Sequence, residues 1–256
     1  MLRREEFHVS GPASLDVHSR SGSVEVRVGA AGRVVVTIDG GSADSWEVVQ
    51  VGDSVSVRPG GRGGGWRSRS TRVHVDVPEG CDVDVSTASA DVVGVGDLGD
   101  LRVRTASGDV RVDRARRLDA STASGDVRVH EVGSDASCST MSGDVDLRTV
   151  GGRLRASTAS GGVRVAQVGE AVDVGTASGD VSLHCCDGDE VSVKCVSGDI
   201  SLGLPSGIRV EPDISTLSGK TMLPSKASSG LHDGGRRTVR VRLRTVSGDV
   251  RIARAT

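Results

Sequence analysis

Nine short segments of this chain repeat one motif, approximately Thr-Ala-Ser-Gly-Asp-Val. The copies begin at Thr87, Thr105, Thr122, Thr140, Thr158, Thr176, Cys195, Thr216 and Thr245. From Thr105 to Thr176, successive copies are 17, 18, 18 and 18 residues apart. A fixed period of this length is typical of repeat proteins, in which each unit buries its apolar face only against its neighbours. The sequence therefore predicts a stack of equivalent structural units.

Each period also contains the alternation of a β-strand. In Leu101–Thr105, inward-type side chains alternate with arginines, as expected for a strand with one buried face. After Gly108 the alternation resumes in Val110–Val112, one residue out of phase. This phase shift at Ser-Gly-Asp indicates a corner or bulge, where glycine adopts backbone shapes that other residues resist.

A β-solenoid explains this pattern, with two or three short strands and two corners in each coil of about 18 residues. The second corner recurs at Val132-Gly133, Val150-Gly151 and Val168-Gly169. The alternative is a series of β-hairpins forming an antiparallel sandwich, whose strands also recur at short intervals. We favour the solenoid because it stacks like residues on like, which requires the same residue at the same point of every unit.

The solenoid predicts two buried ladders. The inward threonines of the motif are Thr105, Thr122, Thr140, Thr158 and Thr176. We expect their hydroxyls to bond to backbone groups or to one another, as buried polar groups do. The valines expected to stack in one buried column are Val110, Val127, Val145, Val163 and Val181.

The chain is predicted to be one continuous all-β domain with irregular β caps at both ends. Its 36 glycines, single Phe, two Trp and lack of Tyr suit a narrow solenoid core. Residues 1–80 contain strands of uneven length and are predicted to form the N-terminal cap, with Ser21–Val24 a degenerate copy of the motif at which the solenoid could begin. Residues 81–256 are predicted to form the repeat solenoid, with a Gly/Ser-rich insertion at 224–237 and a final coil at Thr238–Ile252.

Charge and targeting signals favour a cytoplasmic protein. The net charge of −2 gives no general attraction to nucleic acid or membranes. Met1–Glu6 is charged and is not followed by the apolar stretch of a signal peptide, and no apolar run approaches the length of a membrane span. The five cysteines lack the spacing of a disulfide framework. We therefore expect no membrane and no nucleic-acid partner.

The repeat resembles a known family. The unit Thr-x-Ser-Gly-Asp-Val-x-Val, the Pro-x-Gly turn at Val75–Gly80 and the closing segment Thr238–Ile252 are similar to the bacterial β-strand-repeat "putative adhesin" family, a domain of unknown function. The resemblance covers nearly the whole chain. It implies a β-solenoid-like fold and no established enzymatic activity, and it transfers no catalytic residues.

The aspartates of the motif are the main candidate site. They are Asp91, Asp109, Asp126, Asp144, Asp180, Asp199 and Asp249. Stacked carboxylates about 5 Å apart repel one another, so the column needs compensation. We interpret these residues as turn caps that bond to nearby backbone amides. Their charge would be neutralised by arginines two residues further on, at Arg111, Arg128, Arg164 and Arg251.

Calcium is the alternative for the aspartate column, because 18 residues is twice the nonapeptide of calcium-binding β-rolls. The chain lacks the Gly-Gly-x-Gly-x-Asp pattern of those proteins, and the column is interrupted at Gly162 and Lys220. We therefore favour turn capping with arginine neutralisation.

Two other clusters are weaker candidates. His184, Cys185, Cys186, Asp187 and Cys195 are close in sequence, but adjacent strand cysteines point to opposite faces and do not readily share a zinc ion. A Gly/Arg loop carries a possible partner-binding set, Arg62, Trp66, Arg67 and Arg69. A single Trp offers little base stacking, so this loop does not predict nucleic-acid binding.

These observations predict a non-catalytic scaffold or binding module that uses no cofactor. Its partner would be an unidentified protein or a second copy of the chain. No nucleophile elbow, Ser/His signature or phosphate loop is present in the sequence. The alternative is a calcium- or polysaccharide-binding, or polysaccharide-hydrolysing, solenoid that uses the outward aspartate column.

Overall fold

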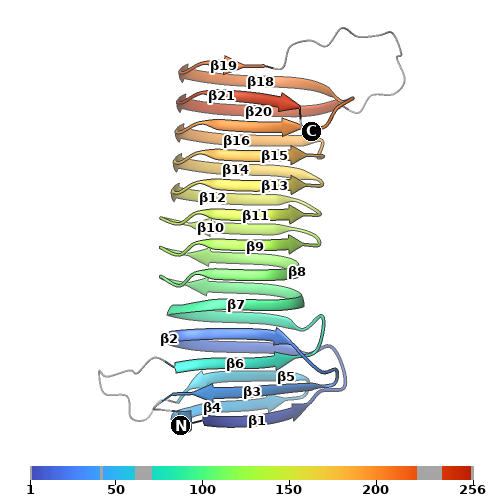
Figure 1. Cartoon of the computed structure of the whole chain (residues 1–256), viewed down its shortest axis with the longest axis vertical. Helices are drawn as coiled ribbons and strands as arrows, with labels where there is room; N and C mark the ends of the chain where they lie inside the picture. Colours follow the sequence, from blue (N-terminus) through green and yellow to red (C-terminus); the bar gives the residue numbers. More distant parts are fainter. Residues whose placement is uncertain (1, 41–42, 61–70, 224–237, 255–256) are drawn as a thin grey trace. The chain divides into compact units, whose positions relative to one another are not determined.

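The computed structural model describes residues 2–40, 43–60, 71–223 and 238–254. In these ranges all regular structure is β-strand except for one short 3-10 helix, Ala43–Ser45. No helix in the described ranges is long and apolar enough to cross a membrane. The chain forms two compact units, Met1–Gly133 and Ser134–Thr256. Each unit is a stack of β-coils (Figure 1).

The described residues of the N-terminal unit form nine strands. They are β1 (Leu2–His8), β2 (Ser14–Val28), β3 (Arg33–Asp39), β4 (Trp46–Val51), β5 (Ser54–Pro59), β6 (Thr71–Val77), β7 (Asp82–Thr105), β8 (Val110–Thr122) and β9 (Val127–Val132).

Long parallel strands form the body of this unit. Strand β2 pairs in parallel with β7, β7 with β8, and β8 with β9. Residues Ser21–Val24 lie opposite Ser89–Val92, so the degenerate motif copy occupies the position of a true copy, as predicted. On its other side, β2 pairs in parallel with β5 through its first half and with β6 through its second half.

The N-terminal end of the stack changes from parallel to antiparallel pairing. Strand β4 runs antiparallel to β5, β3 to β6, and β1 to β3. Side chains also join the two outermost strands: Arg3 of β1 donates to the Trp46 carbonyl, and Gln50 of β4 donates to the His8 carbonyl at 2.6 Å. These bonds occupy backbone carbonyls at an end of the sheet where a further strand could otherwise add.

In the C-terminal unit, the part of the chain that the structure describes forms twelve strands. They are β10 (Ala136–Thr140), β11 (Val145–Val150), β12 (Leu154–Ser160), β13 (Val163–Val168), β14 (Ala171–Ser178), β15 (Val181–Cys186), β16 (Glu190–Ser197), β17 (Ile200–Leu204), β18 (Arg209–Ser218), β19 (Thr221–Met222), β20 (Thr238–Ser247) and β21 (Val250–Arg254).

Each coil of this unit is two strands joined by the Ser-Gly corner. The first strands of successive coils pair in parallel, as do the second strands, so equivalent residues face each other. Val145 lies opposite Val163, and Val163 opposite Val181, and all three are at most 1% exposed. In the N-terminal unit, Val110 and Val127 are paired and buried in the same way. The predicted coils and valine column are confirmed, and the hairpin sandwich is excluded for the repeats.

The spatial order of the last coils differs from the sequence order. Strand β20 pairs in parallel with β16 on one side and with β18 on the other, and β21 lies in the same way between β17 and β19. The coil β20–β21 is therefore inserted beneath the coil β18–β19, which lies at the end of the stack (Figure 1). The prediction that Thr238–Ile252 is the final coil is wrong in space, although this coil is last in sequence.

Burial explains this order. The inward residues of the inserted coil, such as Leu243 and Val250, are 0% exposed. The end coil is poorer in core residues: Pro212 and Thr221 occupy inward positions and are exposed. A proline lacks a donor N–H, so Pro212 also weakens the outer edge of β18 as a template for another strand.

The threonine ladder is buried throughout but is bonded differently in the two units. In the N-terminal unit, Gly108 and Gly125 donate their N–H groups at 3.0 Å to the hydroxyls of Thr105 and Thr122. A Cβ at Gly108 would overlap the Ala90 carbonyl of the adjacent coil, so glycine is needed at this corner.

In the C-terminal unit, the corner glycines donate to the next coil instead. Gly161 and Gly179 bond to serine carbonyls of neighbouring corners at 3.0 Å. The glycine N–H groups are thus not available to the hydroxyls of Thr158 and Thr176. The buried hydroxyls of Thr140, Thr158 and Thr176 have no hydrogen-bond partner among the described residues. The prediction that every threonine hydroxyl is bonded is wrong for these three.

Replacing Val145 with Asp tests the buried column. The change places an unpaired carboxylate at a fully buried position, and we expect it to cost several kcal/mol of unfolding free energy, measured by chemical denaturation. Ser201→Asp is the matched control, because Ser201 lies on the exposed face of β17. A Val145→Asp protein as stable as the control would contradict the stacking.

Candidate functional site

The motif aspartates join coil to coil through hydrogen bonds. In the N-terminal unit, the Asp91 Oδ1 accepts the backbone N–H of Asp109 at 3.0 Å. Asp109 Oδ1 in turn accepts the backbone N–H of Asp126 at 3.1 Å. Each carboxylate therefore bonds to the corresponding residue of the next coil, and not to its own turn.

The C-terminal unit repeats this arrangement. The acceptor–donor pairs are Asp144 with the Gly162 N–H at 2.8 Å, Asp180 with Asp199 at 2.9 Å, Asp199 with Asp249 at 2.8 Å, and Asp249 with Lys220 at 2.8 Å. This series follows the spatial order of the coils, because Asp249 of the inserted coil lies between Asp199 and Lys220. We call the whole set the aspartate ladder.

The interruption at Lys220 now has a structural reason. Lys220 belongs to the end coil, beyond which the described residues contain no further coil whose N–H needs an acceptor. Its own backbone N–H is satisfied by Asp249. Gly162 differs, because it lies inside the stack and leaves the Asp180 N–H without a carboxylate from that coil.

Arginines bind the second oxygen of several ladder carboxylates. Arg111 donates to Asp109 Oδ2 at 2.8 Å, and Arg128 to Asp126 Oδ2 at 2.7 Å. Arg164, which follows Gly162, reaches back one coil to Asp144 Oδ2 at 3.3 Å. These pairs reduce the repulsion between stacked carboxylates.

Arg251 behaves differently from the other three arginines. Its guanidinium lies 3.9 Å from the Met222 sulfur of the end coil, and no ion pair involves it in the described part of the chain. At the coil β20–β21, the aspartate ladder is therefore held by hydrogen bonds to backbone N–H groups, from Asp249 to Asp199 and from Lys220 to Asp249.

The residue types in the described ranges do not assemble a metal centre. No group of three or more His, Cys, Asp or Glu side chains is suited to hold a metal ion within those ranges. In the ladder, one oxygen of each bonded carboxylate already accepts a backbone N–H. The arrangement therefore supplies structural bonds between coils rather than a coordination sphere.

The cysteines near His184 are poorly suited to ligation or nucleophilic chemistry. Cys185 lies opposite Gln167 and Cys186 opposite Val168, and only Cys186 is buried. Burial raises the pKa of the Cys186 thiol to about 12 and raises the pKa of Cys185 as well. Both thiols stay protonated at neutral pH, and a thiolate is the form that attacks or binds metal.

The predicted partner loop lies outside the described residues. This applies to Arg62, Trp66, Arg67 and Arg69, and to the insertion at 224–237. Their role stays a prediction from the sequence.

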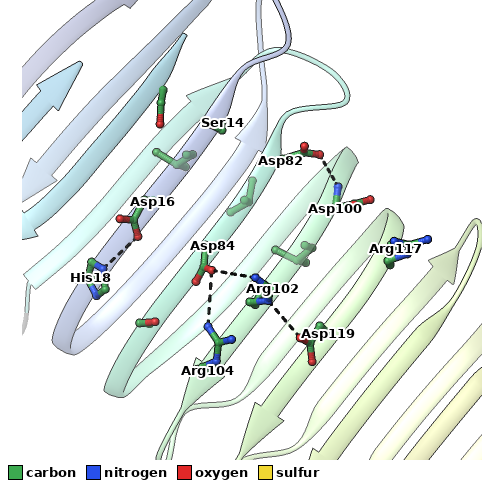
Figure 2. A pocket seen from close by; sticks show the side chains of 15 residues that line it. Ser14, Asp16, His18, Asp82, Asp84, Asp100, Arg102, Arg104, Arg117 and Asp119 are labelled. Atoms are coloured by element: carbon green, nitrogen blue, oxygen red, sulfur yellow. Dashed lines mark hydrogen bonds and ion pairs between the residues drawn. The ribbon is translucent and has the colours of Figure 1, made fainter. Parts of the chain in front are cut away.

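The structure reveals a shallow groove that sequence reasoning missed. It has a volume of about 610 Å³ and lies on the outward face of β2, β5, β7 and β8, all in the N-terminal unit. Figure 2 shows its polar side chains projecting from neighbouring strands. The charged residues and the histidine that line it are Asp16, His18, Asp82, Asp84, Asp100, Arg102, Arg104, Arg117 and Asp119.

Ion pairs cross the groove from strand to strand. Asp84 Oδ2 lies 3.9 Å from Arg102 and 3.7 Å from Arg104, and Arg102 Nε lies 3.2 Å from Asp119 Oδ2. These side chains are 38% to 56% exposed. Asp16 and His18 form a separate pair at 3.2 Å (Figure 2). Five aspartates and three arginines line the groove, and Arg116 beside it pairs with Asp82 and Asp100.

The groove contains the residue types of a catalytic triad but not its bonds. The register places Ser86 beside His18, whose Nε2 contacts Asp16. No hydrogen bond joins Ser86 to His18 in the described part of the chain. In a catalytic triad the nucleophile is hydrogen-bonded to its base, and this bond is not formed between Ser86 and His18.

The groove could have been predicted from the sequence only if the pairing register of the strands had been known. Asp16, Asp84 and Asp119 are outward residues of three different coils, and 68 residues separate the first two. The motif period does not reach back to β2 with regular spacing, so the alignment of Asp16 with Asp84 emerges only from the pairing.

A family model supports the fold independently. The model described as Toastrack DUF4097 matches residues 12–253. The chain belongs to this family. The predicted resemblance to β-strand-repeat proteins of unknown function is confirmed, and the Toastrack match includes both the groove and the aspartate ladder.

Three solved structures illustrate the similarity. A "putative adhesin" from Bacteroides fragilis is 12% identical with a TM-score of 0.49, covering 98% of this chain and 96% of that chain. A "putative lipid binding protein" from Parabacteroides distasonis is 15% identical with a TM-score of 0.48, covering 100% and 97%. A "putative adhesin" from Parabacteroides distasonis is 10% identical with a TM-score of 0.44, covering 99% and 97%. These TM-scores are below 0.5, so we draw no argument from them. Among curated proteins, none matches the chain.

Asp109 tests the two functions of a ladder carboxylate. Asp109→Asn keeps an oxygen that accepts the Asp126 N–H and loses the ion pairs with Arg111 and Arg128, so we expect a loss of about 1 kcal/mol or less. Asp109→Ala removes the acceptor and should cost more, about 1–2 kcal/mol. Urea denaturation of the full chain measures both. Equal losses for Asn and Ala would show that the inter-coil bond contributes nothing.

Gly162→Asp should stabilise the protein by completing the ladder. A Cβ at Gly162 meets no atom closer than 3.5 Å, and the residue is not among the positive-φ glycines. The new carboxylate can accept the Asp180 N–H and pair with Arg164, for a gain of about 1 kcal/mol. Gly162→Ala is the control, since it changes only backbone freedom. An Asp variant no more stable than the Ala variant would rule out the added bond.

Proposed function

We propose that the protein is a non-catalytic binding module whose N-terminal groove receives a protein partner. The observation that carries the proposal is the network of Asp84, Arg102, Arg104 and Asp119 across neighbouring coils (Figure 2). A rigid sheet holds these charges in fixed rows. A partner with the complementary rows would be recognised by position as well as by charge.

The ion pairs of the groove are weak enough to be exchanged. Arg102 and Arg104 are more than half exposed, and exposed pairs of this kind contribute little to stability. Replacing them with ion pairs to a partner therefore costs the fold little. A buried salt-bridge network would resist such an exchange.

The shape of the groove favours a macromolecule over a small ligand. Small-molecule sites are enclosed and largely apolar, with a few converging polar groups. This groove is open and lined mainly by charged side chains, and its described lining residues include no Phe, Trp or Tyr. A broad charged surface is typical of the polar part of a protein–protein interface.

The non-catalytic part of the proposal rests on geometry. Ser86 and His18 are not hydrogen-bonded, and the groove is too open to exclude water from a reaction. Two sequence-based expectations complete the proposal: a cytoplasmic location, and an auxiliary contact from the Gly/Arg loop that carries Arg62 and Trp66.

A charge swap tests the groove without destabilising the fold. Asp84→Arg combined with Arg102→Glu reverses one ion pair and places like charges beside Arg104 and Asp119, which costs little stability at these exposed positions. We expect the full-length variant to melt like the wild type and to lose partners that the wild type captures from native cell extract. The double swap Arg155→Asp with Asp173→Arg, in the C-terminal unit, is the matched control.

Three results of these experiments support or overturn the proposal. Partners lost by the groove swap and kept by the control support the proposal. Identical capture by both variants would overturn the groove as the binding site. Hydrolysis of an activated ester by the wild type that disappears in Ser86→Ala would overturn the non-catalytic assignment.

A further inference from the structure

We propose that Lys194, Arg242 and Arg244 form a second binding site, which takes an extended acidic segment of a protein. The site lies on the outward face of β16 and β20 in the C-terminal unit. It shares no residue with the N-terminal groove and does not depend on the function proposed for that groove.

The register places like charges side by side. Lys194 lies directly opposite Arg244, and both are exposed. Like charges at facing positions of neighbouring strands destabilise a sheet. Nothing in the packing of the fold requires a cation at either outward position. The pair therefore costs stability and needs another explanation.

Too few carboxylates are present to neutralise these cations. Arg242 and Arg244 share a single partner, Asp213 of β18, at 3.5 Å and 4.0 Å. No ion pair involves Lys194 within the described ranges. The neighbouring Arg240, by contrast, lies in register between Glu190 and Glu211. Asp173 and Glu190 line the same surface hollow as Lys194 but form no ion pair with it. The positive charge without an ion-pair partner therefore lies at Lys194 and on the pair Arg242 and Arg244, which share one aspartate.

Small residues leave room beside the cations. Gly175 of β14 lies opposite Lys194, and a Cβ on it would meet no atom within 4 Å. Ser157 and Ser215 continue the same row on β12 and β18. A ligand carboxylate can therefore approach the Lys194 and Arg244 side chains without meeting bulky neighbouring side chains.

The spacing of the cations matches an extended peptide. Arg242 and Arg244 are alternate residues of the parallel strand β20 and so lie about 6.6 Å apart, with Arg240 next in the same row. Side chains on one face of an extended peptide have the same spacing, so alternating Glu or Asp residues would meet successive arginines. Guanidinium groups also bind carboxylates in a favourable forked geometry.

Single-stranded nucleic acid is a poorer fit for this surface. Binding of unpaired bases relies on stacking against aromatic side chains. The sequence from residue 134 to 256 contains no Phe, Trp or Tyr. The acidic peptide is therefore the ligand that the observations favour.

Peptide binding by the full-length protein tests the proposal. The probe is a fluorescent peptide of about twelve residues with alternating Glu and Ser, long enough to span β20. We expect it to bind, and we expect a peptide of the same composition with its Glu residues in one block to bind at least about fivefold more weakly. The double variant Lys194→Gln with Arg244→Gln should lose at least about tenfold in affinity.

Two further variants separate the site from general electrostatics. Gly175→Val fills the space beside Lys194 and should weaken the peptide without changing the charge. Arg155→Gln removes one positive charge from the same face, where Arg155 already pairs with Asp173, and should leave affinity within about twofold. Thermal melting of each variant confirms that it is folded.

Three results would overturn the proposal. The first is equal binding of the alternating and block peptides, because this would remove the spacing argument. The second is unchanged binding by the Lys194/Arg244 double variant. The third is tight binding of single-stranded DNA or polyphosphate together with no binding of the peptide, which would assign the cations to a different class of polyanion.

Discussion

In-register parallel stacking places each residue against its own equivalent, and this constraint governs the rest of the structure. Stacked valines gain from it, because apolar surfaces meet and exclude water. Stacking would destabilise the aspartates, because each negative charge faces another from the next coil. The ladder solves this problem by turning each carboxylate toward a backbone N–H of the next coil, as Asp199 does with Asp249. The same residues that repel by charge thus bind the coils together.

The sequence predicts the repeat well because the constraint acts on every coil alike. Period, strand alternation and the inward valines follow from Val145 and its equivalents. The order of the last coils does not follow, because the copies at Thr216 and Thr245 look alike within a single period. Lys220 in place of Asp marks the end coil, but this follows from the sequence only if the motif carboxylate is known to accept an N–H of the next coil. Outward residues such as Asp16 and Lys194 carry no periodic signal, so both proposed binding surfaces could be located only from the strand register.

The threonine ladder shows how one motif accommodates two corner geometries. In the N-terminal unit the hydroxyls of Thr105 and Thr122 accept a glycine N–H. In the C-terminal unit that N–H is used between coils, and the hydroxyl of Thr158 is left unsatisfied. A threonine therefore fits both corners at different energetic cost. Sequence identity at the motif does not specify which bonding pattern is used.

The inserted coil has a consequence for biosynthesis. A simple solenoid can add each coil as it leaves the ribosome, since every new coil stacks on one already made. Here the coil β18–β19 is synthesised before β20–β21 but rests on it. The coil β20–β21, on which β18–β19 rests, is complete only when Arg254 has been added. Until then, the edge of β16–β17 lacks the coil that covers it in the native fold. The completion of this end of the fold is therefore a late event, timed by the synthesis of the last coil rather than by the order of the repeats.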